Sequence, residues 1–254
     1  MKSDIKEHVK KRYGEYAEKR GSCCGSSCGC GDNNGSAVDQ SKSVGYSAEE
    51  LSGIPQDANL GLGCGNPIAY ADLKPGETVL DLGSGAGIDA FLASKKVGDS
   101  GKVIGVDMTE KMIIKARKNA IRNGYKNVEF RLGDIEEMPV EDDSIDVVIS
   151  NCVINLTEDK LRTFKEAYRV LRKGGRILVS DLVTDGKLPE EVMRSYDAWA
   201  ECIAGALPKA EYISAIRAAG FKDVSIVAES RYSEPDMDGE IYGKILSVKV
   251  SAVK

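Results

Sequence analysis

Three glycines and three acids between residues 81 and 134 have the spacing of a nucleotide-binding site. Val79-Leu-Asp-Leu-Gly-Ser-Gly-Ala-Gly87 is a short apolar run followed by glycines at alternate positions, and a helical pattern begins at Ile88. Glycine lets a backbone approach a ligand closely, and a helix amino end offers unpaired N–H groups. Asp107 ends the next apolar run, where an acid can bind a pair of ribose hydroxyls, and Asp134 ends the third.

This pattern differs from two better-known nucleotide motifs, because the third glycine comes too early for Gly-x-Gly-x-x-Gly and no Gly-Lys-Ser/Thr follows. From about Pro75 to Lys254 it resembles the class I S-adenosylmethionine-dependent methyltransferases. The resemblance implies an α/β, Rossmann-like fold, with a mainly parallel seven-stranded sheet and helices on both faces. It also implies S-adenosyl-L-methionine as cofactor, bound by Asp81, Gly83, Ser84, Gly85, Asp107 with Met108, Asp134 with Ile135, and Asn151.

Three cysteines lie in separate segments that this fold would bring near the cofactor. Cys152 follows an expected strand, 144–150, and so lies at the carboxyl edge of the sheet. We expect Cys202 on a helix that begins at Pro189 and covers the same cleft, and Cys64 in a glycine-rich loop. Either of the first two alone is more simply explained as a small buried hydrophobe. Three thiolates together select a soft ion, and trivalent arsenic takes three such ligands and keeps a lone pair.

The segments around these cysteines are similar to the three cysteine motifs of the arsenite S-adenosylmethionine methyltransferases: Leu62-Gly-Cys-Gly-Asn-Pro67, Asn151-Cys-Val-Ile-Asn-Leu156 and Glu201-Cys-Ile-Ala-Gly-Ala-Leu207. The resemblance implies methylation of arsenite to methylarsenicals, with Cys64, Cys152 and Cys202 as catalytic arsenic(III) ligands. It also implies thioredoxin or glutathione as the thiol reductant. Attack by the arsenic lone pair on the sulfonium methyl group needs no general base at arsenic.

The chain departs from that family in two places. It has an amino-terminal cluster, Cys23, Cys24, Cys28 and Cys30, without the paired spacing of a structural zinc site. This cluster is interpreted either as a thiol-rich tail for soft metals or metalloids, or as a linker with incidental cysteines. We also expect the chain to lack the additional carboxyl-terminal region of longer family members.

Two other functions stay open on the sequence. One is methyl transfer to a quinone-like or other small organic acceptor, with incidental cysteines. The other is a non-catalytic arsenite-binding protein that uses its amino-terminal thiols. Thiol-dependent methyl transfer to arsenite excludes the first, and arsenite binding without turnover of S-adenosylmethionine would support the second.

Composition narrows the class of protein. The 254 residues are 42% hydrophobic with a net charge of −5, and no basic stripe with interleaved aromatics favours a nucleic-acid partner. No signal-peptide core or membrane-length apolar run is seen, so we expect a soluble cytoplasmic protein in which the seven cysteines are mostly thiols. The single histidine, His8, argues against histidine-based zinc sites and catalytic Ser-His or Cys-His pairs.

The expected elements fall into two units. Residues 1–43 form an amphipathic helix, from Ser3 to Arg20, and a flexible thiol-rich segment, 21–43; residues 44–254 form the methyltransferase domain. Strands and helices alternate in the domain, which predicts parallel strands with right-handed crossovers. The fifth strand is expected at 176–180, and the last two strands are expected to be an antiparallel pair that closes the sheet.

Overall fold

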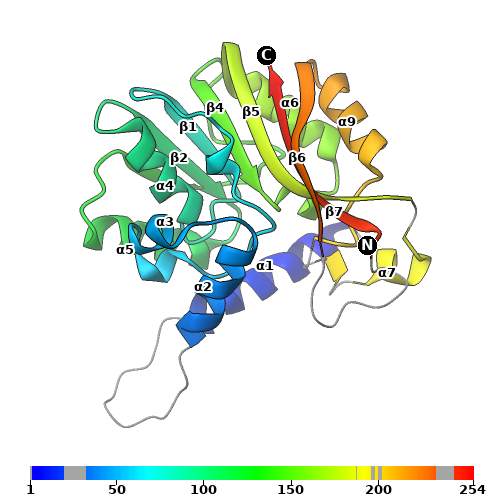
Figure 1. Cartoon of the computed structure of the whole chain (residues 1–254), viewed down its shortest axis with the longest axis horizontal. Helices are drawn as coiled ribbons and strands as arrows, with labels where there is room; N and C mark the ends of the chain where they lie inside the picture. Colours follow the sequence, from blue (N-terminus) through cyan, green and yellow to red (C-terminus); the bar gives the residue numbers. More distant parts are fainter. Residues whose placement is uncertain (1, 20–32, 187, 196–197, 200–201, 233–242) are drawn as a thin grey trace.

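Seven strands form one sheet in the order β3-β2-β1-β4-β5-β7-β6 (Figure 1). The computed structural model describes residues 2–19, 33–186, 188–195, 198–199, 202–232 and 243–254. Strands β3, β2, β1, β4 and β5 are parallel, whereas β7 runs antiparallel to both β5 and β6, as predicted. The strands are β1 (Thr78–Leu82), β2 (Lys102–Asp107), β3 (Val128–Leu132), β4 (Ile145–Asn151), β5 (Leu171–Thr184), β6 (Lys222–Arg231) and β7 (Ile245–Val253).

Helices cover both faces of this sheet, which confirms the predicted fold class (Figure 1). No described helix has the length and apolar character needed to cross a membrane. The helices are α1 (Lys2–Lys19), α2 (Asn33–Ser43), α3 (Ala48–Ser52), α4 (Ile88–Val97), α5 (Glu110–Arg122), α6 (Lys160–Val170), α7 (Glu190–Arg194) and α9 (Lys209–Ala218), with short 3-10 turns η1 (Gln56–Ala58), η2 (Pro67–Ala69) and η3 (Ile154–Leu156).

Two apolar cores lie on opposite faces of the sheet. Successive strand side chains point to opposite faces, so Val79 packs with Phe91 of α4 and Ile113 of α5, while Leu80 faces the side of Phe164 in α6 and Tyr212 in α9. The central parallel strands are covered on both faces, which explains their continuous apolar runs. These cores fix the carboxyl ends of the parallel strands, where the site lies.

Helix α5 carries one strongly exposed apolar side chain. Met112, Ile113 and Ala116 are buried, but Ile121 is 81% exposed. Nine residues separate Ile121 from Met112, and at about 100° per residue this places the two side chains on opposite sides of the helix.

The amino-terminal region is more regular than predicted. The amphipathic helix is present as α1, but 33–43, expected to be flexible, form helix α2. Ala37 of α2 is buried, and the Ser41 hydroxyl donates to Asn59 Oδ1 at 2.8 Å. Packing of α2 against the loop that contains Asn59 therefore stabilises as a helix a segment whose own composition does not favour one. Cys23, Cys24, Cys28 and Cys30 lie outside the described residues.

Candidate functional site

The glycine-rich turn after β1 is shaped by contacts that exclude larger side chains. Gly83 has a φ of 64°, and a Cβ placed on it would lie 2.3 Å from Val153 Cγ2. Gly85 has a φ of 52°, and a Cβ there would meet no described atom within 4 Å. The first glycine therefore allows close packing against the segment after β4, and the second leaves open space above the turn. Helix α4 begins immediately afterwards, at Ile88.

Three acids border this turn at the ends of successive strands. Asp81 on β1 is buried, and its Oδ2 has no hydrogen-bond partner among the described residues. Burial raises the pKa of Asp81 well above its usual range, and the charges of Asp89 and Asp107 raise it further. Burial also raises the pKa of Asp107, although its carboxylate accepts hydrogen bonds from the backbone N–H groups of Thr109, at 2.8 Å, and Gly85, at 2.9 Å.

Asp134, after β3, is held by the amino-terminal helix. Lys6 of α1 forms ion pairs with Asp134 and with Glu136, the latter at 2.7 Å. Partial burial raises the pKa of Asp134, but the hydrogen bond and charge of Lys6 outweigh this effect and lower it overall. Asp134 is therefore a carboxylate at neutral pH, with one flank already taken by a lysine.

These groups line a cavity that opens to solvent, and the empty space in it and in its mouth together is about 1100 Å³. Helix α1 contributes Lys6, Val9 and Tyr13 to its wall, and Figure 1 shows this helix running below the sheet. Every residue predicted to contact the cofactor lines the cavity: Asp81, Gly83, Ser84, Gly85, Asp107, Met108, Asp134, Ile135 and Asn151.

The charge and the open space of the cavity suit S-adenosylmethionine. The unpartnered carboxylate oxygen of Asp81 suits the cationic part of that molecule, and the open space above Gly85 lets a ligand reach the turn. Unpaired buried carboxylates are costly without a partner, so a bound cation is a physical reason for Asp81 to be there.

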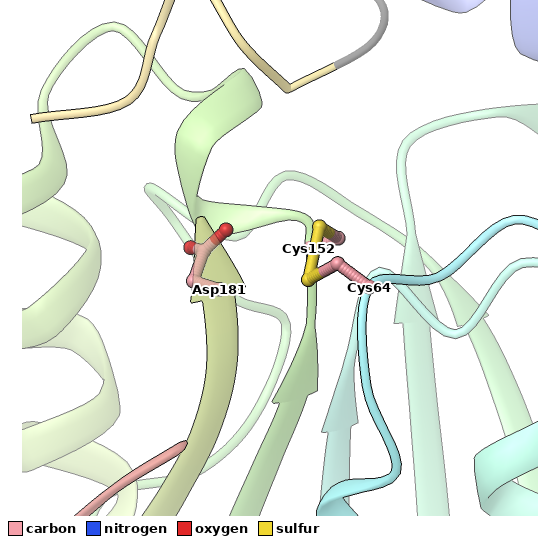
Figure 2. Close-up of side chains that lie close together, drawn as sticks. All are labelled: Cys64, Cys152 and Asp181. Carbon is pink, nitrogen blue, oxygen red and sulfur yellow. A yellow bond between two sulfur atoms is a disulfide. The ribbon is translucent and has the colours of Figure 1, made fainter. Parts of the chain in front are cut away.

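Cys64 and Cys152 meet beside this cavity as a disulfide (Figure 2). Their Cα atoms are 5.8 Å apart, within the usual range for a disulfide. The expectation that the cysteines are mostly thiols is therefore wrong for two of the three that are described, whereas Cys202 remains a thiol. The loop before β1 crosses the carboxyl end of β4, which brings two cysteines 88 residues apart into contact.

Asn151 ties the Cys64 loop to the end of β4. Its Oδ1 accepts from the Cys64 N–H at 3.2 Å, and its Nδ2 donates to the Gly65 carbonyl at 2.7 Å and to Asp89 at 3.1 Å. Asp89 also accepts from the Tyr46 hydroxyl at 2.7 Å, and burial raises its pKa to about 6. The roles of Tyr46 and Asp89 in the site were not predicted from the sequence. An acid in the first helical turn after a glycine-rich loop could have indicated Asp89.

Cys202 lies beside the disulfide. It was expected on a helix, but it does not lie on one. Helix α7 ends at Arg194, and Cys202 lies in a turn with a φ of 64°. Its Sγ donates to the Cys152 carbonyl at 2.7 Å. Gly205 allows this segment to pack closely on η3, because a Cβ there would lie 1.9 Å from the Asn155 carbonyl oxygen. The described residues Ala198 and Trp199 are helical, so Cys202 follows a helical segment instead of lying within it.

Asp181 lies next to Cys64 and Cys152, and it was not predicted from the sequence as a site residue. One of its carboxylate oxygens and the sulfurs of Cys64 and Cys152 all lie within 4.8 Å of one another (Figure 2). Burial raises the pKa of Asp181 to about 7, opposed by the Leu182 N–H, the charge of Lys160 and the Tyr212 hydroxyl. Strand β5 extends to Thr184 rather than ending at residue 180, which carries Asp181 to the site edge.

The sequence matches the methyltransferase domain family over residues 73–238. With the sheet order and cofactor cavity described above, this match defines a class I S-adenosylmethionine-dependent methyltransferase fold. Solved structures agree: the phosphoethanolamine N-methyltransferase 2 of Haemonchus contortus, in complex with S-adenosyl-L-methionine, has a TM-score of 0.60 at 20% identity, covering 76% of this chain and 53% of that one.

More specific relatives are arsenic enzymes. The arsenite methyltransferase of Halobacterium salinarum is 43% identical over 99% of this chain and 67% of its own length. The human arsenite methyltransferase is 44% identical over 51% of this chain and 37% of its own length. The crystal structure of an arsenic(III) S-adenosylmethionine methyltransferase from Chlamydomonas reinhardtii has a TM-score of 0.69 at 35% identity, covering 86% of this chain and 73% of that one. The chain belongs to the arsenite methyltransferase family.

Proposed function

We propose that this chain transfers the methyl group of S-adenosyl-L-methionine to arsenite, and that Cys64, Cys152 and Cys202 hold the arsenic. The observation that carries the proposal is the meeting of three cysteines from separate segments beside one cofactor cavity. Two of them are already bonded, and the third lies 2.7 Å from the Cys152 carbonyl. Full-length similarity to the Halobacterium arsenite methyltransferase supports the same substrate.

The reaction requires the reduced chain, because a sulfur in a disulfide does not bind arsenic. Two thiol groups of the reductant, from one dithiol or from two monothiol molecules, open the Cys64–Cys152 bond by exchange, become a disulfide themselves, and leave their two protons on the cysteines. Thioredoxin or glutathione and the reducing cytoplasm meet this need, and we include them in the proposal. Each thiol then forms a bond to arsenic, and a hydroxyl of arsenite leaves as water with the thiol proton.

The residues of the cavity have separate roles in this proposal. Asp107 accepts from the ribose hydroxyls beside Met108, and Asp134 with Ile135 binds the adenine edge. The methionine portion lies against the turn of Gly83, Ser84 and Gly85, with Asp81 facing its positive charge and Asn151 beside it. When bound, the cofactor supplies an electrophilic methyl group for in-line transfer to the arsenic lone pair.

The Asn151 hydrogen bonds hold the Cys64 loop at the cavity wall, so that arsenic bound there and the cofactor share one enclosed space. Holding two reactants in line supplies roughly 7–11 kcal/mol of the barrier reduction in favourable cases. A quinone-like acceptor is less well supported. The Arabidopsis thaliana 2-phytyl-1,4-beta-naphthoquinone methyltransferase matches 45% of this chain, whereas the Halobacterium arsenite methyltransferase matches 99%.

Incubation with methyl-labelled S-adenosylmethionine, arsenite and a dithiol, followed by arsenic speciation, tests the proposal. We expect labelled methylarsenicals from the parent chain and none from Cys152→Ser. A variant carrying Cys23→Ser, Cys24→Ser, Cys28→Ser and Cys30→Ser is the matched control and should retain turnover. Tight arsenite binding without methylated product would instead indicate a binding protein. Transfer of label to an organic acceptor, with arsenite untouched, would contradict the substrate.

A further inference from the structure

The amino-terminal helix reaches the cysteines as well as the cofactor cavity. Val9 of α1 is 1% exposed and packs in the same apolar cluster as Cys64, Cys152 and Cys202, with Tyr13 against it. Tyr13 also lines the cavity. A helix from the start of the chain therefore brings a phenol to three cysteines that lie at residue 64 and beyond.

The helix is anchored on both sides of Tyr13. Lys6 pairs with Asp134 and Glu136, Lys115 donates to the Ala17 carbonyl at 3.1 Å, and Lys111 pairs with Glu18 at 2.7 Å. Four groups of the methyltransferase core thus fix the axial position of α1. These ion pairs and this hydrogen bond therefore also fix the position of the Tyr13 ring.

The phenol and two of the cysteines form a short chain of hydrogen bonds. Tyr13 and Cys202 are hydrogen-bonded through their side chains, and the Cys202 thiol donates to the Cys152 carbonyl at 2.7 Å. A thiol carries one proton, so Cys202 accepts from the Tyr13 hydroxyl while it donates to the carbonyl. The order of donation is Tyr13 to Cys202 to Cys152.

Arsenic binding changes only one of these bonds. As the Cys202 sulfur bonds to arsenic, an As–O bond breaks and the thiol proton leaves with the hydroxide as water. The donation to the Cys152 carbonyl ends with that proton, but the Tyr13 hydroxyl still has a sulfur acceptor, now with thiolate character. Hydrogen bonds to charged acceptors are stronger than neutral ones.

We propose that Tyr13 is a positioning residue for Cys202: its hydroxyl donates to the sulfur and holds it toward the cavity in the arsenic-bound state. The inference rests on the proposed function, since it takes Cys202 as an arsenic ligand. Tyr13 does not touch the arsenic. Groups that hydrogen-bond to metal ligands typically change metal affinity about 10–100-fold when removed, and we expect the same of this phenol.

The test removes one hydroxyl. Tyr13→Phe keeps the ring, and Tyr16→Phe is the matched control, because Tyr16 lies on the same helix with its ring 6.1 Å from that of Tyr13. Both are made in the full chain with Cys23→Ser, Cys24→Ser, Cys28→Ser and Cys30→Ser, so that no amino-terminal thiol binds arsenite. The reduced proteins are titrated with arsenite, without cofactor, by the ultraviolet absorption of the arsenic–thiolate bonds.

We expect Tyr13→Phe to bind arsenite about 10–100-fold more weakly, with an altered absorption band. Tyr16→Phe should bind within twofold of the parent. The circular dichroism spectra and cooperative thermal unfolding of both variants should match those of the parent and so report an intact fold. Unchanged arsenite affinity in Tyr13→Phe would overturn the inference.

A double-mutant cycle separates positioning from a general structural role. If Tyr13 acts through Cys202, then adding Tyr13→Phe to Cys202→Ser should cause no further loss of arsenite affinity. Additive losses would refute the assignment. The cycle also separates this inference from the proposed function: parent-like binding by Cys202→Ser would remove Cys202 from the ligand set, whereas loss in Cys202→Ser with none in Tyr13→Phe would reject only the role of Tyr13.

Discussion

Asp107 joins the glycine-rich turn to the end of β2 and, in our proposal, to the cofactor ribose. Its carboxylate already accepts two backbone N–H groups. Asp107→Ala should weaken binding of S-adenosylmethionine by about 1.5–3 kcal/mol, as expected for a hydrogen bond to a charged group. Calorimetry measures this loss, with Asp72→Ala, an exposed acid outside the cavity, as the control. Parent-like affinity in Asp107→Ala would take the residue out of the site.

The Asp181 carboxyl should make stability depend on pH. Its pKa is raised by burial from 3.8 to about 7 in the folded chain, so the folded state holds the proton more tightly than the unfolded state. The stability linked to this proton is complete below about pH 4 and is lost as the pH rises through about 7. Each pKa unit corresponds to about 1.4 kcal/mol, so the loss is on the order of 4 kcal/mol.

The Asp181→Asn variant does not lose stability in this way, because an amide side chain does not ionise. Urea unfolding of parent and variant at pH 5, 6, 7 and 8 should show a difference that grows with pH in favour of the variant. A difference that stays constant across this range would mean that Asp181 ionises alike in the folded and unfolded chains.

At single residues, position could be predicted where strand ends determine it. Asp107, Asp134 and Asn151 each end or follow a recognisable apolar run, Asp81 lies within the first run, and all four line the cavity, while their contacts with the cofactor stay predictions. The Cys64–Cys152 bond was not predicted, because a pairing across 88 residues depends on how the loop crosses the sheet. Tyr13 lies within the predicted amphipathic helix, and that prediction does not give its neighbour in the fold.

Helix α1 covers the site without belonging to the two main cores. Neither core on the two sheet faces contains a residue of α1, whereas Val9 and Tyr13 lie in the cluster around the cysteines. A chain shortened by residues 1–19 should therefore lose only the helical signal of α1 from its circular dichroism spectrum and should still unfold cooperatively. It should bind S-adenosylmethionine more weakly, because part of the cavity wall is gone. Loss of cooperative unfolding would show instead that α1 is required for the fold.

Helix prediction failed at helix ends and where packing competes with local preference. The sequence near Cys202 has helical spacing and Ala198 and Trp199 are helical, yet Cys202 lies in a turn with a positive φ. Gly205, beyond that turn, packs against the Asn155 carbonyl. In α2 the effect is reversed, since burial of Ala37 holds a polar segment in a helix. The β strands were predicted more accurately because burial on both faces leaves an apolar run in the sequence itself.

For the whole molecule, the redox state should decide which ligands stabilise the fold. The cavity acids do not depend on the disulfide, whereas the proposed arsenic ligands do. S-adenosylmethionine should raise the melting temperature of both oxidised and reduced protein, and arsenite only that of the reduced protein. A ligand at 100 times its Kd adds about 2.7 kcal/mol, which a thermal shift assay detects. Equal arsenite stabilisation of the oxidised chain would place its binding elsewhere.

The Cys64–Cys152 bond also has a consequence for the unfolded chain. It closes a loop across 88 residues that contains β1, β2, β3 and β4. In the chain-entropy description, a loop of this length lowers the entropy of the unfolded ensemble enough to stabilise the fold by about 4–5 kcal/mol. Arsenic bound to the same two sulfurs closes the same loop, and its third bond closes another of 50 residues, to Cys202. The substrate of this reaction is then also a cross-link. During turnover it replaces the Cys64–Cys152 bond, which restrains the oxidised chain.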